Sequence, residues 1–261
     1  MQVRSVGLVN WMGIATLVRR EWLRMLDIYK ITLLAPAVTA LLMLAVFGLI
    51  LGDLRETIGG VPAILFIAPG LVAYAMMERT FEDSSISLMF DKMEGIIGDV
   101  LVPPMGPGEL ITGYLLSGII NGLLNLAIVG SVVWLCSPMT VEAPLRLLFF
   151  VPAILLLLSS LGMVLGIFAN KWDQWQAVET FAFMPLTYLS GMFFTADRLP
   201  ESLRWIVEIN PLYYAIDGMR GGFLGQSEVD PLTGFSVVLG SALAVTAAVW
   251  LMFRSGYRLK D

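Results

Sequence analysis

Six long stretches without a charged residue constrain the fold of this chain more than any other feature. An α-helix needs about 20 apolar residues to cross the roughly 30 Å of hydrocarbon in a bilayer. Five of the stretches reach that length alone, and the shortest reaches it together with residues 175–179. We therefore predict an all-α integral membrane protein with six transmembrane helices. The stretches are Ile31–Gly52, Thr57–Met77, Leu110–Val141, Leu147–Asn170, Thr180–Ala196 and Pro231–Phe253.

The composition leaves little room for anything besides the membrane spans. The chain has 261 residues, of which 57% are hydrophobic, and its mean hydropathy is +0.81. A separate soluble domain would need more polar sequence. We predict one membrane domain over residues 1–261. Its parts are a cytoplasmic lead (1–30), spans one to five (31–196), an external re-entrant segment (197–230), span six (231–253) and a cytoplasmic tail (254–261).

Several kinds of chemistry are excluded by what the sequence lacks. Histidine is absent and Cys136 is the single cysteine, so neither histidine acid–base catalysis nor an intrachain disulfide is available. No lysine follows a glycine, so there is no phosphate-binding loop of the nucleotide-binding type. The net charge is −5 and the longest basic run is the pair Arg19–Arg20, so nucleic acid is not an expected partner. We predict no catalytic, cofactor or metal site in this chain.

The basic residues fix an expected orientation. Eleven of the 16 lysines and arginines fall on one side of the six spans and five on the other. Cytoplasmic loops carry the excess of basic residues in membrane proteins, so both termini are expected in the cytoplasm. The eleven are Arg4, Arg19, Arg20, Arg24, Lys30, Arg79, Lys92, Lys171, Arg254, Arg258 and Lys260.

The segment before the first span has the pattern of an amphipathic helix. Apolar residues recur at spacings of three and four, whereas Arg20, Arg24 and Asp27 lie on another face. Trp11 and Trp22 are typical of interfacial anchors, and the arginines would meet lipid headgroups. We expect a helix lying in the cytoplasmic interface. An ordinary solvated lead into the first span is the alternative.

The segment between the second and third spans, residues 78–109, is the longest on the cytoplasmic side. Helical spacing of apolar residues from about Asp83 to Val100 predicts a short amphipathic helix, which Pro103–Pro104 would end. Such a helix at the membrane surface is suited to docking a cytoplasmic protein. An ordinary loop is the alternative.

Polar residues near or within the spans allow two interpretations each. Glu78, Glu82 and Asp83 fit a hydrated helix end better than a cation or proton site. Asn121 and Asn125 fit interhelical hydrogen bonding better than a polar conduit. No charge is expected near mid-membrane, which argues against a proton-coupled carrier. Two small-residue motifs, Gly118-x-x-x-Gly122 and Gly162-x-x-x-Gly166, would let helices approach closely.

The segment before the last span, residues 199–225, is too hydrophobic for a free loop and too interrupted for a span. Asn210-Pro211 divides it into two half-helices, because proline lacks an amide donor and clashes with the preceding turn. Irregular backbone at membrane depth needs protein or water to satisfy its polar groups. A re-entrant hairpin over an exit would fit this pattern, and an interfacial hairpin without a gating role is the alternative.

Two parts of the chain have a recognisable signature, one within residues 78–109 and one within residues 185–225. The residues that carry it are Phe90, Lys92, Glu94, Val100-Leu101-Val102, Leu189-Ser190-Gly191, Phe193-Phe194, Leu199-Pro200, Asn210-Pro211, Tyr214, Arg220 and Gly225. With these residues the chain resembles ABC-type-2 exporter permeases over nearly its whole length. It is most similar to the small bacterial permeases related to those exporting nodulation factors and surface polysaccharides. In the first part, however, Gly98-Asp99 stands where the family usually has a glutamate.

This resemblance implies a homodimer in the bacterial inner membrane, in contact with lipid and with a separate cytoplasmic ABC ATPase dimer that binds ATP and Mg²⁺. The implied residues that couple the chain to the ATPase are Met89, Met93, Glu94, Ile97, Asp99 and Leu101. The implied anchors of the lead helix are Trp11, Arg20, Trp22 and Arg24. The implied residues of the external gate are Asn210, Pro211, Tyr214 and Arg220.

The substrate is not determined by the sequence, and an amphipathic lipid, a glycan or a drug-like molecule would each fit. Aromatic residues near the span ends, such as Tyr188 and Phe193, would either stack on cargo or form the usual interfacial belt. Two other functions remain open. One is a membrane anchor or assembly factor without a transport cycle, and the other is a secondary carrier.

Overall fold

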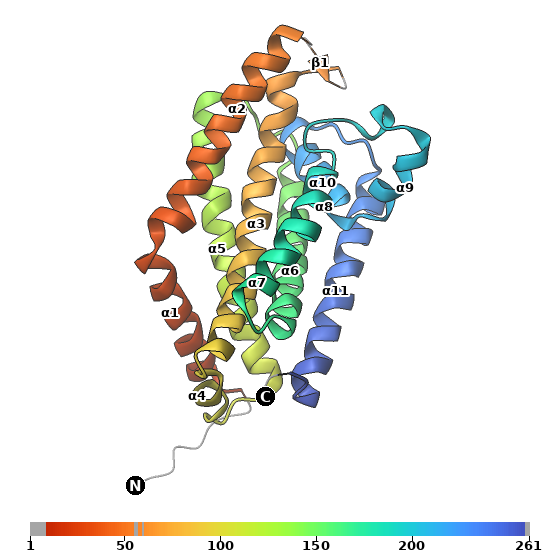
Figure 1. Cartoon of the computed structure of the whole chain (residues 1–261). Helices are drawn as coiled ribbons and strands as arrows, with labels where there is room; N and C mark the ends of the chain where they lie inside the picture. Colours follow the sequence, from red (N-terminus) through yellow and green to blue (C-terminus); the bar gives the residue numbers. More distant parts are fainter. Residues whose placement is uncertain (1–8, 55–56, 59, 259–261) are drawn as a thin grey trace.

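Helices form almost the whole of the described chain, which confirms the predicted all-α membrane fold (Figure 1). The computed structural model describes residues 9–54, 57–58 and 60–258. Among these residues, five helices are long and apolar enough to cross a bilayer. They run over Lys30–Gly48, Ala63–Met93, Pro107–Cys136, Pro144–Phe168 and Pro231–Ser255.

The first half of the chain contains the lead helix and three of the long helices. Its elements are α1 (Trp11–Asp27), a π-helical turn (Lys30–Leu34), α2 (Ala35–Leu54), the antiparallel strands β1 (Thr57–Ile58) and β2 (Val61–Pro62), α3 (Ala63–Met93), α4 (Ile97–Leu101) and α5 (Pro107–Cys136).

The second half contains two long helices and several short ones between them. Its elements are α6 (Pro144–Phe168), α7 (Trp172–Val178), a π-helical turn (Glu179–Phe183), α8 (Met184–Tyr188), a 3-10 turn (Ala196–Arg198), α9 (Glu201–Ile209), α10 (Pro211–Leu224) and α11 (Pro231–Ser255).

The second predicted span is wrong at both ends. The stretch begins as the β1–β2 hairpin rather than as helix, and α3 continues from Ala63 to Met93 without a break. The separate helix predicted from about Asp83 to Val100 is therefore also wrong. Its first part belongs to α3, and the chain turns at Gly95, whose φ of 73° is in the left-handed region that favours glycine. Only the five-residue α4 follows.

The fifth predicted span begins and ends earlier than expected. α7, the π-helical turn and α8 run together from Trp172 to Tyr188, about 26 Å at 1.5 Å per residue. This segment is slightly shorter than the hydrocarbon thickness. The chain then turns at Gly191, whose φ is also 73°. The apolar residues 189–196 thus form a turn rather than the end of a span.

α3 lies at the centre of the bundle, and small residues on its neighbours make this possible. Gly118 of α5 and Gly162 of α6 both face α3, so their backbones approach it closely. Ser84 of α3 and Ser159 of α6 share a hydrogen bond of 2.7 Å at this contact. The two glycine motifs therefore do bring helices together, as predicted, and α3 is the helix they contact.

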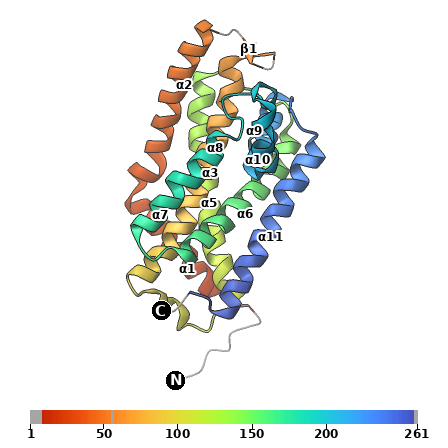
Figure 2. The same cartoon turned by 45° about the vertical axis from the view of Figure 1, so that its right-hand side comes forward.

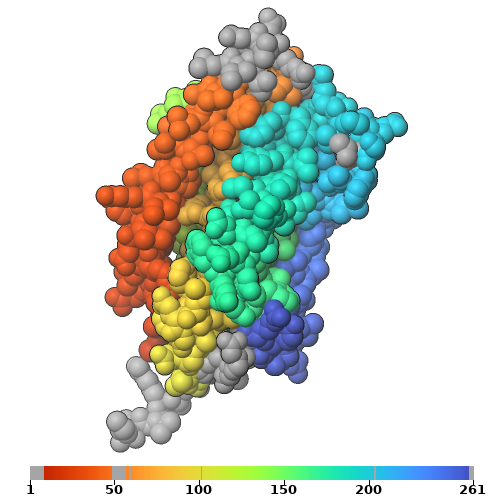
Figure 3. All heavy atoms as spheres, in the orientation of Figure 1, coloured from red at the N-terminus to blue at the C-terminus, as the bar shows by residue number. Residues whose placement is uncertain are grey.

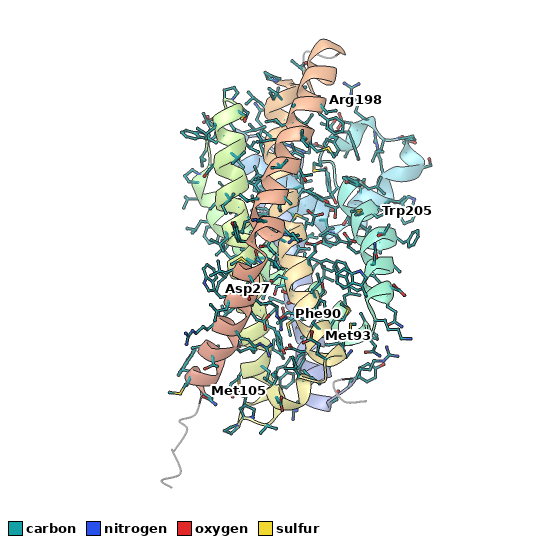
Figure 4. All side chains as sticks on the ribbon, turned by 60° about the vertical axis from the view of Figure 1, so that its left-hand side comes forward. Asp27, Phe90, Met93, Met105, Arg198 and Trp205 are labelled. Carbon is teal, nitrogen blue, oxygen red and sulfur yellow. The ribbon has the colours of Figure 1, made fainter. Side chains whose placement is uncertain are left out.

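The two ends of the bundle differ in what they carry (Figure 1). The start of α1, the short α4 and the end of α11 lie at the lower end, while the β1–β2 hairpin and α9 lie at the upper end. α10 packs against α3, α6 and α11 in the upper half, and the turned view in Figure 2 shows α9 outside it. Figure 4 likewise places Phe90, Met93 and Met105 toward the lower end and Arg198 at the upper one.

Candidate functional site

The lead helix is bound to the bundle by charged groups at the lower end. Asp91 of α3 is completely buried. It accepts a hydrogen bond of 3.0 Å from Arg24, a second from Arg20, and one of 2.6 Å from Tyr114 of α5. Glu21 is 2% exposed and pairs with both arginines. We call Arg20, Glu21, Arg24, Asp91 and Tyr114 the clasp.

The clasp corrects the predicted role of the lead-helix arginines. Arg20 and Arg24 keep about a third of their side-chain surface exposed, but their guanidinium groups bind Asp91 and Glu21 rather than pointing to headgroups. The physical reason is that two buried carboxylates need two positive charges. Trp11 and Trp22 do face outward, with 70% and 37% of their surface exposed. The arginines therefore anchor α1 to α3, a partner that spacing could not reveal.

Most of the predicted coupling residues lie at the lower end, around the turn between α3 and α4. Met93, Glu94 and Asp99 are exposed and Ile97 is half-buried, whereas Leu101, placed in α4, lies outside the side chains that the structure describes. Met89 is different, because it is fully buried in the core. Met89 therefore packs in the hydrophobic core rather than at the surface of the chain, and its coupling role stays a prediction.

Lys92 connects this turn to the end of α6. Its ammonium group donates hydrogen bonds of 3.3, 2.6 and 3.2 Å to the carbonyl oxygens of Gly166, Ile167 and Ala169. Those carbonyls belong to the last turn of α6 and its cap, where a helix presents unpaired acceptors and the negative end of its dipole. A displacement of the α3–α4 turn would thus be transmitted to α6.

A groove opens on the side of the bundle between α2 and α8, with α3 as its floor. Its volume is about 320 Å³, and apolar side chains such as Ala40, Met43 and Leu71 form much of its lining. In Figure 3 the surfaces of α2 and of α7–α8 flank a hollow in which α3 is visible. Tyr74, Glu78 and Arg79 supply the polar part of the lining. The side of a membrane protein rarely has such a mixed surface without a use.

The charged residues of this groove lie deeper in the bundle than the sequence indicated. Ser84, further along α3 than Glu78, meets Ser159 well inside the part of α6 that carries no charged residue, 147–168. Glu78 therefore lies farther still from the lower end, beside apolar helices. The interpretation of Glu78 and Glu82 as a hydrated helix end is wrong, as is the expectation of uncharged spans. The sequence concealed this because α3 continues past the apolar stretch, so that its charged part packs inside the bundle.

Three carboxylates meet in this region. One oxygen from each of Glu78, Glu82 and Glu179 lies within 4.8 Å of the others. Arg79 pairs with Glu82, and Tyr74 donates a hydrogen bond to Glu78. We call Glu78, Glu82 and Glu179 the acidic cluster. Helical periodicity could not have identified Glu179 as a member of the cluster. Its contact with Glu78 and Glu82 of α3 is between segments that are far apart in the sequence.

Asp83 points to the other side of α3, away from the acidic cluster. It accepts hydrogen bonds of 3.0 Å from Ser117 and 2.9 Å from Asn121 of α5. Asn125 donates to the Asn121 carbonyl oxygen at 3.1 Å. The interhelical interpretation of the two asparagines is therefore confirmed for Asn121, and Asp83 is the partner.

The outer segment divides where the sequence predicted. Asn210 lies between α9 and α10, and Pro211 is the first residue of α10. The Asn210 side chain accepts a hydrogen bond of 3.0 Å from Leu212 and donates to the Leu186 carbonyl oxygen at 2.7 Å and to Ser190 at 2.9 Å. It thus caps α10 and connects it to the end of α8.

Arg220 of α10 is buried rather than facing an opening. Its guanidinium group lies 3.7 Å from the Phe66 ring centroid, donates to the Gly191 carbonyl oxygen at 2.6 Å, and pairs with Glu228 at 3.5 Å. Burial raises the pKa of Glu228, although the Ala196 amide and the Arg220 charge counteract part of this shift. Arg220 therefore connects the turn at Gly191 with the loop at Glu228, which follows α10. Its role in a gate stays a prediction.

Tyr214, the remaining predicted gate residue, donates a hydrogen bond of 2.8 Å to the Glu208 carbonyl oxygen of α9. It connects the two half-helices across the Asn210-Pro211 break.

Replacing Asn210 with alanine should lower the free energy of unfolding by about 1 kcal/mol, the usual effect of removing an N-cap side chain. The midpoint of thermal unfolding in detergent would measure this loss. Asn210→Asp is the matched variant, because aspartate keeps the acceptor for Leu212 but loses the two donors. An alanine variant as stable as the parent would show that the α9–α10 turn does not depend on this side chain.

Comparison with known proteins agrees with this architecture. The family model described as ABC-2 type transporter matches residues 12–224. The inner membrane transport permease YadH of Escherichia coli strain K12 is 28% identical over 251 residues, which cover 96% of this chain and 98% of that protein. Nodulation protein J of Rhizobium leguminosarum bv. trifolii is 30% identical over 230 residues, 86% and 85% of the two chains. The chain therefore belongs to the ABC-2 type transporter family.

Proposed function

We propose that this chain is the membrane-spanning permease subunit of an exporter driven by a separate ABC ATPase dimer, which binds ATP and Mg²⁺. Family membership over residues 12–224 is the observation that carries this proposal. The cargo is an amphipathic molecule of lipid, glycan or drug-like character. Two copies of the chain form the translocation pathway within the lipid bilayer.

The lower end has features that an ATPase partner would use. Around the α3–α4 turn, Met93 and Val102 leave 46% and 80% of their surface exposed, beside the acidic residues Glu94 and Asp99. An apolar centre with a charged rim is typical of protein interfaces. The clasp joins α1 to α3, and Lys92 joins α3 to α6, so a push at this surface would move three helices together.

The location that we propose is the bacterial inner membrane, with both termini in the cytoplasm. The Escherichia coli relative, an inner membrane transport permease, supports this choice of membrane. The excess of basic residues supports the orientation, and the start of α1 and the end of α11 lie at the same end of the bundle.

The experiment that tests the proposal is purification of the tagged chain in lipid nanodiscs, followed by identification of any co-purifying ATPase. The hydrolysis rate of that ATPase should change when the chain is present in lipid. Finding no such partner would favour a membrane anchor or assembly factor. Transport by the purified chain driven by a proton or sodium gradient would favour a secondary carrier. The buried charges of α3 make this alternative stronger than it was from the sequence.

Replacing both Glu94 and Asp99 with alanine should weaken ATPase binding about tenfold, because exposed charge pairs contribute on the order of 0.7 kcal/mol each. Membrane insertion should stay intact, since both side chains are exposed. Titration of the ATPase against nanodisc-bound chain would measure the change. Glu201→Ala, an exposed carboxyl on α9 at the upper end, is the control. Unchanged binding in the double variant would remove these two residues from the coupling surface.

A further inference from the structure

We propose that the groove between α2 and α8 binds an amphiphile with an organic cationic head group, such as a quaternary ammonium attached to an apolar chain. This inference rests on the proposed function, because it assigns the substrate class of an export pathway. The evidence for the inference is the charge of the acidic cluster, the aromatic side chains next to the cluster and the apolar walls of the groove.

The charge balance of the groove favours a cation. The acidic cluster brings three carboxylates together, and Arg79, which pairs with Glu82, is the cation that the structure places against them. With all four groups ionised, the single guanidinium, which also acts on Glu78 and Glu179, leaves an excess of two negative charges beside apolar helices. Uncompensated charge in such surroundings is costly. An additional positive charge in the groove would lower this cost, whereas an anionic head group would increase it.

Glu179 is the member of the cluster that comes from outside α3. It is 8% exposed, and no hydrogen bond to its side chain occurs within the described part of the chain. Its oxygen still lies within 4.8 Å of those of Glu78 and Glu82. A buried carboxylate close to two others, with the Arg79 charge acting on it but no hydrogen-bond donor of its own, has the environment of a cation ligand.

Aromatic side chains extend from the cluster along the groove. Tyr74 donates a hydrogen bond to Glu78, and its ring stacks on Tyr188 with a centroid separation of 6.0 Å. Tyr188 stacks on Phe193 at 6.4 Å, and Phe193 on Phe47 of α2 at 4.4 Å. Aromatic faces attract organic cations, and most strongly where water is excluded. Sugars also stack on aromatic rings, but a neutral sugar would leave the two carboxylates uncompensated.

The apolar lining favours an organic cation over a metal ion. Ala40, Met43 and Leu71 border the same groove and would contact an alkyl chain. A divalent metal ion would gain nothing from these apolar walls. A cationic head group in the cluster with its chain along α2 uses the carboxylates, the aromatic rings and the apolar walls of the groove.

The experiment measures binding of radiolabelled dodecyltrimethylammonium, below its micellar concentration, to the full chain in lipid nanodiscs. Empty nanodiscs give the background from partition into lipid. We expect saturable binding to the chain. Competition should be strong with unlabelled dodecyltrimethylammonium and absent with dodecyl sulfonate. It should also be weak with the neutral isostere in which a quaternary carbon replaces the ammonium nitrogen.

Two conservative variants test the cluster, since glutamine keeps the volume of glutamate. Glu179→Gln and Glu78→Gln should each weaken binding about tenfold, as expected for loss of one charge-assisted contact. Tyr188→Leu should weaken it several-fold through loss of the aromatic face. Glu201→Gln, an exposed carboxyl outside the groove, should bind like the parent. Thermal unfolding of each variant establishes whether it is folded.

Three outcomes would overturn the inference. The first is equal competition by the neutral isostere, which would indicate apolar binding alone. The second is full binding by both glutamine variants. The third is displacement of the label by Ca²⁺ or Mg²⁺ at micromolar concentration, which would identify a metal site. The binding measurement needs no ATPase, so the two proposals can fail separately. If the chain binds no cation but an ATPase partner is found, the proposed function stays intact. Cation binding without any ATPase partner would instead contradict the export function.

Discussion

Replacing Gly162 with leucine is expected to destabilise the protein by about 3 kcal/mol, the upper part of the range for overpacked cores. A Cβ atom at this position would lie 2.4 Å from the Phe81 carbonyl oxygen and 3.0 Å from the Ser84 Cβ. The first of these atoms is backbone, so relief requires α3 and α6 to separate. Their separation would also break the Ser84–Ser159 hydrogen bond. The midpoint of thermal unfolding in detergent would report the loss.

Gly240 of α11 offers a matched control for this variant. It also lies in a long apolar helix, but a Cβ atom there would meet nothing within 4 Å among the described residues. Gly240→Leu should therefore unfold at the midpoint of the parent or slightly above it, because leucine favours a helix more than glycine does. Equal stability of the Gly162 and Gly240 variants would mean that the contact between α3 and α6 is looser than the structure describes.

Replacing Asp91 with asparagine should release α1 from the bundle at a loss of about 2 kcal/mol. Asparagine keeps an acceptor for Tyr114 but removes the negative charge that holds Arg20 and Arg24. The loss is smaller than for a fully buried pair, because both arginines are about one-third exposed and still bind Glu21.

The effect of this substitution should be local. Hydrogen exchange followed by mass spectrometry should show faster exchange in α1, Trp11–Asp27, with little change in α6. Asp99→Asn, an exposed carboxyl of α4, is the control. Exchange in α1 as slow as in the parent would show that its apolar contacts, such as Ile14 and Leu17, hold the helix without the clasp.

The overall architecture could be read from hydropathy because a bilayer accepts only helices whose backbone groups are satisfied internally. The limits of α6 and α11 lie within a few residues of the predicted ones. The break at Asn210 was predictable because proline restricts its neighbours whatever the tertiary context. Charge bias and the family signature likewise depend on the chain alone.

The sequence misplaced α3 because apolar stretches mark where lipid contact is possible, not where a helix ends. A helix surrounded by other helices can carry Asp83 and Asp91 if partners on α1 and α5 neutralise or hydrogen-bond them. Those partners are distant in sequence, so no periodicity identifies them. For the same reason Arg24 was predicted to meet lipid headgroups.

The sequence by itself determined that this chain is a helical membrane protein, where most of its spans lie, and which family it resembles, because these properties follow from local hydrophobicity and local backbone chemistry. Only the tertiary structure decided that α3 is central, that the clasp holds α1, and that Glu179 joins Glu78 beside a groove. These contacts are made between segments far apart in the chain, and their energies depend on burial and charge pairing, which exist only once the helices are packed.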